Sequence, residues 1–331
     1  MIRPQQNSVT ETRGERLVKA MRYSEFGGPE LIREDEVAPP SAAPGDVVIR
    51  MAATSVNGAD WKLGAGVLQD MVHLDFPFTV GLDFSGVVLE LGAGVEDFAV
   101  GDRVYGGVHF DRCGTYAEII SVPADTVCKA PQSIPLATAA AVPVGAQTAW
   151  GALFLEDQGN LQTGQNVLIH GGAGGVGSFG VQLANWRGAH VIVTASQQNH
   201  DYLRSLGAHD TIDYRTTRFE DVVHDVDVVF DCVGGELASR SVPIISKGGR
   251  LVSIASPEVA DLAATHGVQS SFFPGDPGHD TLQQITALID AGTLRVVVTE
   301  EYPLARAAEA LAKHQQGHTR GKILLTINPI D

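Results

Sequence analysis

The sequence is poor in cysteine. Its 331 residues include only Cys113, Cys128 and Cys232, which are widely spaced. Three separated cysteines can form neither a disulfide framework nor a four-cysteine zinc site. So few cysteines are typical of a reducing compartment, and we expect a cytoplasmic location.

Long apolar runs and basic clusters are also missing. No stretch approaches the roughly 20 apolar residues that a membrane-spanning helix needs, and no apolar signal-peptide core follows the start. The chain has 23 Lys and Arg against 39 Asp and Glu, a formal net charge of -16, and no run of basic residues. Nucleic acids and anionic membranes need a basic footprint. The sequence therefore predicts a soluble protein with a small-molecule substrate and no nucleic-acid or membrane partner.

Glycine and apolar residues are abundant, with 37 glycines and 44% hydrophobic residues. This composition and length are typical of a turn-rich α/β protein with two domains. The first residues are polar and lack periodicity, so we predict a disordered extension over residues 1–19. Glu11 and Glu15 argue against a mitochondrial presequence, because such segments are poor in acidic residues.

The rest of the chain has two different sequence patterns. Residues 20–140 contain short β-like runs separated by Gly and Pro, which predicts a compact β-barrel-like domain. An Ala-rich helical segment over 137–155 then leads into alternating strands and helices. The strands are expected at 166–170, 190–195, 211–214, 227–232 and 250–255. This alternation predicts a doubly wound parallel sheet. A helix over 304–316 and a strand over 321–327 end the pattern.

The most informative segment, residues 167–178, reads VLIHGGAGGVGS. A strand-like run leads into Gly172-Ala173-Gly174-Gly175-Val176-Gly177, and an apolar helical pattern follows. In such a motif the first glycine allows a tight turn, the second lets the backbone approach a pyrophosphate, and the third lets helix and strand pack closely. Unpaired N–H groups at the helix start would hold the anion. We predict that these six residues bind a dinucleotide.

Further motifs occur in order along the chain. They are 23–30 (YSEFGGPE), 55–62 (SVNGADWK), 77–86 (PFTVGLDFSG), 101–104 (GDRV), 114–118 (GTYAE), 139–143 (AAAVP), 148–150 (TAW) and 320–322 (RGK). Together they resemble the zinc-independent medium-chain dehydrogenase/reductase family, above all its quinone oxidoreductase-like branch, over about residues 20–327.

The resemblance implies an α/β fold in which a GroES-like β-barrel-type catalytic domain is combined with a Rossmann doubly wound parallel sheet. The catalytic domain would span residues 20–140 and the Rossmann domain 141–290, with a C-terminal return to the catalytic domain over 291–331. The active site would lie in the cleft between the domains. The resemblance also implies a homodimer through the sheet edge near 250–273, although the apolar residues there could equally be interior.

An acidic residue that would bind the ribose 2′-hydroxyl of NAD is missing. The second strand of the nucleotide-binding pattern ends at Ser196, where NAD-preferring enzymes place Asp or Glu. Ser196 can donate to a 2′-phosphate, and the resemblance adds Tyr214 to this pocket. The family's Lys falls on Asn199, so Arg204 and Arg215 are the nearby candidate cations, each alternatively a surface charge. We predict NADPH as the cofactor, with Ser196, Tyr214 and Arg215 around the phosphate.

The resemblance places four more residues along the cofactor. They are Val233, Ile254, Phe273 and Lys322. For Phe273, packing in the core is the alternative to walling the nicotinamide.

The zinc ligands of related dehydrogenases are also missing. Zinc-dependent relatives of the resembled family carry a catalytic Cys in the first of two motifs and a His in the second, but the chain reads 57–60 (NGAD) and 81–83 (GLD). A catalytic zinc needs three protein ligands, so we predict no metal. Without a Lewis acid, alcohol oxidation lacks its main electrostatic stabiliser, whereas a quinone or α,β-unsaturated carbonyl spreads the charge of an added hydride into an enolate.

Three residues are predicted to act in catalysis. The resemblance aligns a cleft-lining Tyr with Lys62, which would polarise or protonate the enolate oxygen or else be a solvated lysine. Asn57 and Thr148 would orient the nicotinamide or its ribose, or else be plain turn and helix-start residues. Asp60 could fix Lys62 or cap the local turn, and Asp83 could be a structural acceptor or catalytic.

These residues predict a zinc-free, NADPH-dependent oxidoreductase that transfers hydride to a quinone or to an enone or enal. The proton would come from Lys62 or from water. An NADPH-dependent reductase of ketones or aldehydes and a non-catalytic NADPH-binding redox sensor are the alternative hypotheses.

Overall fold

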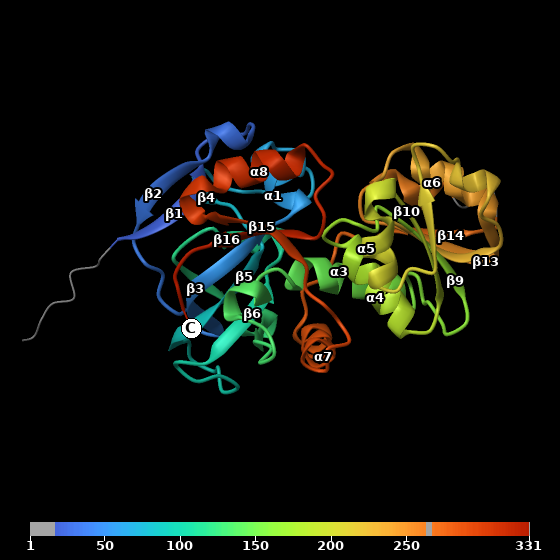
Figure 1. Ribbon diagram of the computed structural model, residues 1–331. Helices are drawn as coiled ribbons and strands as arrows, with labels where there is room; N and C mark the ends of the chain where they lie inside the picture. The colour runs from blue at the N-terminus through green and yellow to red at the C-terminus, as the bar shows by residue number, and fades with distance from the viewer. Residues whose placement is uncertain (1–16, 263–266, 331) are drawn as a thin grey trace, which may run out of the picture.

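The computed structural model describes residues 17–262 and 267–330. They form two lobes, and helices α3 (Pro143–Phe154) and α7 (His279–Asp290) lie between them (Figure 1). Most of the predicted extension, residues 1–16, lies outside the described residues. Strand β1 (Val18–Tyr23) begins inside the remainder of that extension, because Val18 and Lys19 already pair with β2 (Arg33–Val37).

The first lobe is built on a seven-stranded sheet in the order β15-β16-β3-β5-β6-β8, with β7 also paired to β3. The strands are β3 (Asp46–Val56), β5 (Asp83–Leu91), β6 (Arg103–Gly107), β7 (Ile119–Pro123), β8 (Val127–Lys129), β15 (Val298–Pro303) and β16 (Lys322–Thr326). A smaller sheet joins β2, β1 and β4 (Phe78–Thr79). Val47, Ile49 and Phe84 pack in the core of this lobe.

Three helices belong to the first lobe. They are α1 (Gly58–Gly64), α2 (Leu136–Ala139) and α8 (Ala307–Gln315). The sequence pattern does not predict α1, because seven residues are too few for a helical period to stand out. The helix expected over 137–155 is divided into α2 and α3 at Pro143, which lacks a backbone N–H and occupies the first turn of α3.

The second lobe contains a six-stranded parallel sheet in the order β11-β10-β9-β12-β13-β14. The strands are β9 (Asn166–His170), β10 (His190–Ala195), β11 (Asp210–Asp213), β12 (Val226–Asp231), β13 (Ile245–Ser253) and β14 (Gln269–Phe272), and α4 (Gly177–Trp186), α5 (His200–Ser205) and α6 (Glu236–Ser241) accompany them. Val167 and Ile169 pack in one core cluster and Leu168 in another, so both faces of β9 are buried. The predicted doubly wound parallel sheet is confirmed, and β14 is a strand that the pattern does not predict.

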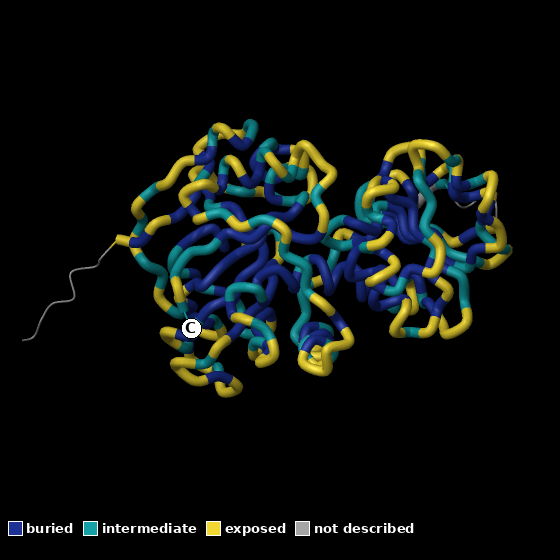
Figure 2. The backbone as a smooth tube through the Cα atoms, in the orientation of Figure 1, coloured by how far each residue is buried: buried dark blue, intermediate teal, exposed yellow. Residues whose placement is uncertain are grey.

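The chain leaves and re-enters the first lobe at one place. Ala140 and Ala141, on the way out, pack with Leu324, and Val296 and Val298, on the way back, pack against the same cluster. Strand β16 then runs antiparallel to β3. Figure 2 shows the buried backbone concentrated along the strands of both lobes. Within the described residues, no helix is long and apolar enough to cross a membrane.

Candidate active site

The glycine-rich loop follows β9 and has the close contacts that its glycines allow. A Cβ on Gly172 would lie 2.2 Å from Cγ1 of Val193, and a Cβ on Gly177 would lie 2.4 Å from the carbonyl oxygen of Gly171. The space beside Gly174 is freer, with Gly171 O the nearest atom at 3.4 Å. The left-handed turn residue is Gly171, with φ of 73°, so the prediction that Gly172 makes the tight turn is wrong by one position.

The end of this loop meets the C-terminal part of the chain. Helix α4 follows Val176, and in its first turn the N–H of Ser178 donates to the carbonyl oxygen of Gly174 at 3.0 Å and that of Gly180 to Val176 at 3.0 Å. The N–H of Gly321 donates to the carbonyl oxygen of Ala173 at 2.9 Å. A Cβ on Gly175 would lie 2.9 Å from Cδ of Lys322. Residues 320–322, called here the RGK segment, therefore lie against the loop predicted to bind the pyrophosphate.

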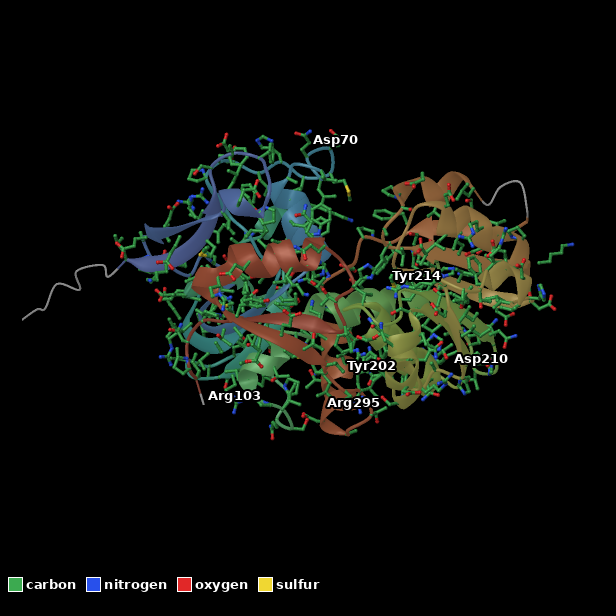
Figure 3. The ribbon with its side chains drawn as sticks, turned by 45° about the horizontal axis from the view of Figure 1, so that its top comes forward. Asp70, Arg103, Tyr202, Asp210, Tyr214 and Arg295 are labelled. Carbon is green, nitrogen blue, oxygen red and sulfur yellow. The ribbon has the colours of Figure 1, made fainter. Side chains whose placement is uncertain are left out.

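Arg320 brings a cation to the end of β10. Its Nε donates to Oδ1 of Asn199 at 3.0 Å, and its Nη2 donates to the carbonyl oxygen of Gln198 at 3.2 Å. Asn199 in turn donates from Nδ2 to Oγ of Ser196 at 3.1 Å. The guanidinium lies 5.0 Å from the ring centroid of Tyr202, a residue labelled in Figure 3. Arg320 belongs to the RGK motif but is not among the residues that the sequence predicts to bind the cofactor.

Neither Arg204 nor Arg215, the two arginines predicted as candidate cations, donates to Asn199 or Ser196 as Arg320 and Asn199 do. Arg204 donates to Oγ1 of Thr211 at 2.8 Å and to Oδ1 of Asp201 at 3.2 Å, so its guanidinium is already engaged. The guanidinium of Arg215 lies 5.8 Å from the ring of Tyr214. Tyr214 is 48% exposed and follows β11, the neighbour of β10 (Figure 3). Tyr214 and Arg215 thus remain available at the rim of the predicted phosphate pocket.

The other predicted cofactor contacts lie at strand ends. Val233 follows β12 and is 54% exposed, and its Cγ2 would lie 2.8 Å from a Cβ on Gly171. Ile254 follows β13 and is half-buried. The ring of Phe273 is buried, and its Cζ would lie 2.3 Å from a Cβ on Gly151. Core packing, the alternative for Phe273, is therefore what the structure shows.

A buried polar cluster occupies the middle of the first lobe. Lys322 donates from Nζ to Oδ1 of Asn57 at 2.6 Å and to Oδ2 of Asp83 at 3.2 Å. Asn57 Nδ2 also donates to Asp83 Oδ2, at 2.8 Å, as does the Ser55 hydroxyl. The N–H of Val144 donates to the other oxygen, Oδ1, at 2.7 Å. Lys322 is 3% exposed and Asp83 0%, so the two form a buried ion pair.

This cluster revises two predictions. Lys322, predicted as a cofactor contact, has its alkyl chain against the glycine-rich loop but its ammonium on Asn57 and Asp83. Asp83 is the acceptor on which the cluster converges, as in the structural alternative. Sequence spacing could not show this ion pair, because its members are 239 positions apart.

Asp60 contacts the same cluster through the backbone of Asn57. Its Oδ2 accepts the backbone N–H of Asn57 at 2.8 Å and the hydroxyl of Tyr116 at 2.9 Å. It therefore caps the start of α1, the second of its two predicted roles. Burial raises the pKa of Asp60 to about 7, although the bonds from Asn57 and Tyr116 oppose the shift.

The raised pKa of Asp60 predicts a pH-dependent gain in stability for Asp60→Asn. The folded protein binds this proton more tightly than the unfolded chain, so the stabilisation is full at low pH and lost as the pH rises through about 7. The variant is never charged, and its Oδ1 can still accept from Asn57. We expect its free energy of unfolding to exceed that of the wild type by a margin that grows from pH 3.8 to about 7 and reaches about 2 kcal/mol or more, given about 1.4 kcal/mol per pKa unit.

Urea unfolding at several pH values measures this margin. Asp70→Asn, at an exposed position on the loop after α1 (Figure 3), is the matched control. A margin that stays constant with pH would contradict the expectation.

Lys62 lies on α1, outside the buried cluster. It is half-buried, its Nζ lies 5.8 Å from the ring of Trp61, and it makes no side-chain hydrogen bond or ion pair with the part of the chain that the structure describes. Burial and the charges of Lys322 and Lys62 lower the pKa of His314 on α8 to about 4, so this imidazole is neutral near pH 7. Lys62 is thus a free cation near the cluster rather than a member of it.

A cavity of about 170 Å³ opens beside the buried cluster. Its lining includes Leu82, which precedes Asp83, and Val144, which donates to Asp83. Thr148, one of the predicted catalytic residues, also lines it. The lining residues are Met71, Leu82, Val108, His109, Phe110, Val144, Gln147, Thr148, Pro274, Gly275, Asp276 and Pro277. Apolar groups dominate and no Lys or Arg is present, so the cavity suits a neutral, largely apolar molecule.

The residues around this cavity do not form a zinc site. Within residues 17–262 and 267–330, no group of three or more His, Cys, Asp or Glu side chains could hold a metal ion. Burial raises the pKa of Cys113 to about 12, which makes it a poor metal ligand and nucleophile near neutral pH. His170 is fully buried and hydrogen-bonded to Thr194 and Ser241, as a structural residue is.

Comparisons with known proteins agree with this architecture. Residues 43–132 match the family model described as an alcohol dehydrogenase GroES-like domain, and residues 206–325 match the one described as a zinc-binding dehydrogenase. The chloroplast envelope quinone oxidoreductase homolog of Arabidopsis thaliana is 30% identical over 326 residues, which cover 94% of this chain and 98% of that protein. The NADPH-dependent alkenal/one oxidoreductase, chloroplastic, of the same plant is 29% identical over 93% of this chain and 79% of its own length.

A solved structure is also similar over nearly the whole chain. The quinone oxidoreductase from Coxiella burnetii has a TM-score of 0.88 and 30% identity, and the match covers 95% of this chain and 100% of that one. The predicted combination of a GroES-like domain with a doubly wound parallel sheet is therefore confirmed. The match to the model described as a zinc-binding dehydrogenase covers residues 206–325, whereas the two motifs in which zinc ligands would be expected lie in the GroES-like match, where the chain has Asn57 and Asp83.

Proposed function

Because the chain belongs to the zinc-independent medium-chain dehydrogenase/reductase family, in its quinone oxidoreductase-like branch, we propose that it is an NADPH-dependent reductase of quinones or α,β-unsaturated carbonyls. The observation that carries the proposal is the apolar cavity beside the buried Lys322–Asp83–Asn57 cluster. Two similar proteins are named for quinone and for alkenal/one substrates.

The chemistry of these acceptors suits the groups that line the site. Bound NADPH would supply a hydride. In a conjugated carbonyl the resulting negative charge spreads from carbon to oxygen, so a hydrogen-bond donor can stabilise it. Such a bond is stronger where apolar side chains surround it, as Leu82 and Val108 do in this cavity. The lining includes the carboxyl group of Asp276 and no Lys or Arg, which disfavours a substrate that is anionic before the reaction.

A preference for NADPH over NADH is supported by the position of Arg320. Its guanidinium lies beside Asn199, where the resemblance expects a lysine, and Asn199 links it to Ser196. An arginine can bind a phosphate through two parallel hydrogen bonds. In this proposal Arg320 would exchange its present acceptors for the 2′-phosphate, with Tyr214 and Arg215 at the rim.

Arg320→Leu is expected to remove the preference for NADPH. The loss of a charge-assisted hydrogen bond costs roughly 1.5–3 kcal/mol, so kcat/KM with NADPH should fall about 10- to 100-fold. The value with NADH should change little, because NADH lacks the phosphate. Steady-state kinetics with both cofactors measure this, and Arg204→Leu is the control because Arg204 is already held by Asp201 and Thr211. Equal losses with both cofactors would contradict the assignment.

The proposed function is tested by oxidation of NADPH, followed by absorbance, with a benzoquinone, an enone, an enal and a saturated ketone. We expect turnover of the conjugated acceptors, an unchanged rate in the presence of a chelator, and a lower rate with NADH. Activity on the saturated ketone alone would instead support a ketone reductase. Tight NADPH binding without turnover of any acceptor would instead support a redox sensor.

A homodimer through β14 is part of the same proposal. Strand β14 stands at one end of the six-stranded order, so a second copy could extend the sheet there. Sedimentation of the full chain would give its mass in solution, and a monomer would contradict the dimer without affecting the proposed chemistry.

A further inference from the structure

We infer that Lys322, rather than Lys62 or a water molecule, hydrogen-bonds to the substrate oxygen and protonates it after hydride transfer. This inference rests on the proposed function and names the proton donor within it. Neither the glycine-rich loop nor the family resemblance points to such a role, since both suggest a cofactor contact. The geometry of the buried cluster carries it.

Lys322 has more N–H donors than acceptors around it. An ammonium group has three N–H donors and no acceptor. Two of them are used, one on Asn57 and one on Asp83, at 2.6 and 3.2 Å. No further acceptor for Nζ occurs within the part of the chain described by the structure. One N–H is therefore left for a ligand.

Lys322 lies between two parts of the site. The alkyl chain of Lys322 packs against Gly175, in the loop that would hold the pyrophosphate. Two neighbours of Asp83 line the cavity: Leu82 precedes it in the sequence, and the N–H of Val144 donates to its carboxylate. Lys322 does not itself line the cavity, but its ammonium is bound to Asp83, whose neighbours do, so it lies between the cofactor loop and the substrate cavity.

The surroundings of Lys322 are also favourable electrostatically. Lys322 is 3% exposed, so a hydrogen bond from it is weakened little by water. Asp83 balances its charge and, with Asn57, fixes the direction of the ammonium. Such a preorganised donor stabilises an oxygen whose negative charge grows during the reaction. Lys62 lacks this support, because it bonds to neither Asn57 nor Asp83.

The proposed step balances as follows. A hydride from NADPH forms a C–H bond at the β-carbon of an enone, and the electron pair of the C=C bond shifts to give an enolate. The enolate oxygen then forms an O–H bond as one N–H bond of Lys322 breaks, which gives the enol and a neutral amine. The enol tautomerises to the ketone in water, and the amine regains a proton from solvent. The sum is NADPH, a proton and the enone converted to NADP⁺ and the saturated ketone.

The test compares Lys322→Met with Lys62→Met in the full chain. General-acid and oxyanion donors typically contribute about 10²–10³-fold to kcat. We expect that loss of kcat in Lys322→Met with an enone, while the NADPH dissociation constant, measured by fluorescence titration, changes by less than about threefold. Lys62→Met should lose less than about tenfold. Lys129→Met, at an exposed position, controls for the loss of a positive charge.

Two further measurements separate chemistry from folding. The double variant Asp83→Asn/Lys322→Met leaves no unpaired buried charge, so it should fold and show the same loss of kcat. Methylamine should partly restore the rate of Lys322→Ala, because it can supply the missing ammonium, but should not restore that of Lys62→Ala.

Three results would overturn the inference. One is a Lys322→Met protein that keeps its kcat and only binds NADPH more weakly, which would make Lys322 a cofactor contact. Another is the large loss of kcat in Lys62→Met instead. The third is no rescue by methylamine in a folded Lys322→Ala protein. A wild-type chain that reduces no acceptor would overturn the proposed function itself, which is a different outcome from an active wild type with an equally active variant.

Discussion

Asp83→Ala is expected to lower the free energy of unfolding by about 3–5 kcal/mol, the range found when one member of a buried ion pair is removed. The substitution leaves the ammonium of Lys322 buried without its counter-ion. It also removes the acceptor of Ser55, Asn57 and the N–H of Val144. Urea unfolding followed by circular dichroism gives the free energy.

Matched variants show how much of this loss in unfolding free energy comes from the unpaired charge of Lys322. Asp83→Asn keeps the shape and part of the hydrogen bonding, and still leaves Lys322 unpaired. The double variant Asp83→Asn/Lys322→Met removes both charges, so it should be more stable than Asp83→Asn alone. If the double variant were the less stable of the two, the buried ion pair would not be the cause of the loss.

Gly174→Ala is expected to abolish tight cofactor binding without unfolding the protein. A Cβ at this position would have no atom of the protein closer than 3.4 Å, so the fold accommodates it. The methyl group would occupy the space through which a pyrophosphate approaches the loop. We expect the NADPH dissociation constant to rise by roughly 100-fold or more, about 2.7 kcal/mol, while the melting temperature in the absence of cofactor changes little.

Gly177→Ala is the contrasting variant at the same loop. Its Cβ would lie 2.4 Å from the carbonyl oxygen of Gly171 and 2.7 Å from Cα of Gly172, both backbone atoms. This variant should therefore lose stability as well as cofactor affinity. A Gly174→Ala protein that binds NADPH as the wild type does would contradict the placement of the cofactor on this loop.

The second lobe could be predicted from the sequence almost completely, for a local reason. Several of its strands, such as 166–170, are short apolar runs followed by a helix, and these elements are specified by neighbours in the chain. The glycine-rich loop is equally local, because residues 171–177 contain both the left-handed turn at Gly171 and the start of α4. Among the described strands of this lobe, β14 could not be predicted, because Gln269, Ser270 and Ser271 are too polar to indicate a strand.

The buried cluster of the first lobe could not be predicted in the same way. Asn57 and Asp83 were singled out, but nothing in their spacing shows that Lys322 joins them from 265 and 239 positions away. Arg320 was missed for the same reason, because it meets Asn199 across 121 positions. Contacts of this kind depend on how β16 returns to β3, which is a property of topology rather than of local pattern.

The path of the chain between the lobes also has a consequence for the order of folding. Asn57 and Lys322 meet across 265 residues, and bringing such distant strands together carries a loop-closure entropy that slows folding. In the folded protein Ala140 and Val298 pack in one cluster with Ala53 and Leu324 of the first lobe, so the chain leaves the first lobe and returns to it at neighbouring points. A second lobe that has already folded brings these two points together, and the distance that the chain must close becomes short. We therefore expect the second lobe to fold first. If the proposed function holds, refolding should then regain cofactor binding before it regains reductase activity, because the buried cluster of Lys322, Asp83 and Asn57 forms only after β16 has paired with β3.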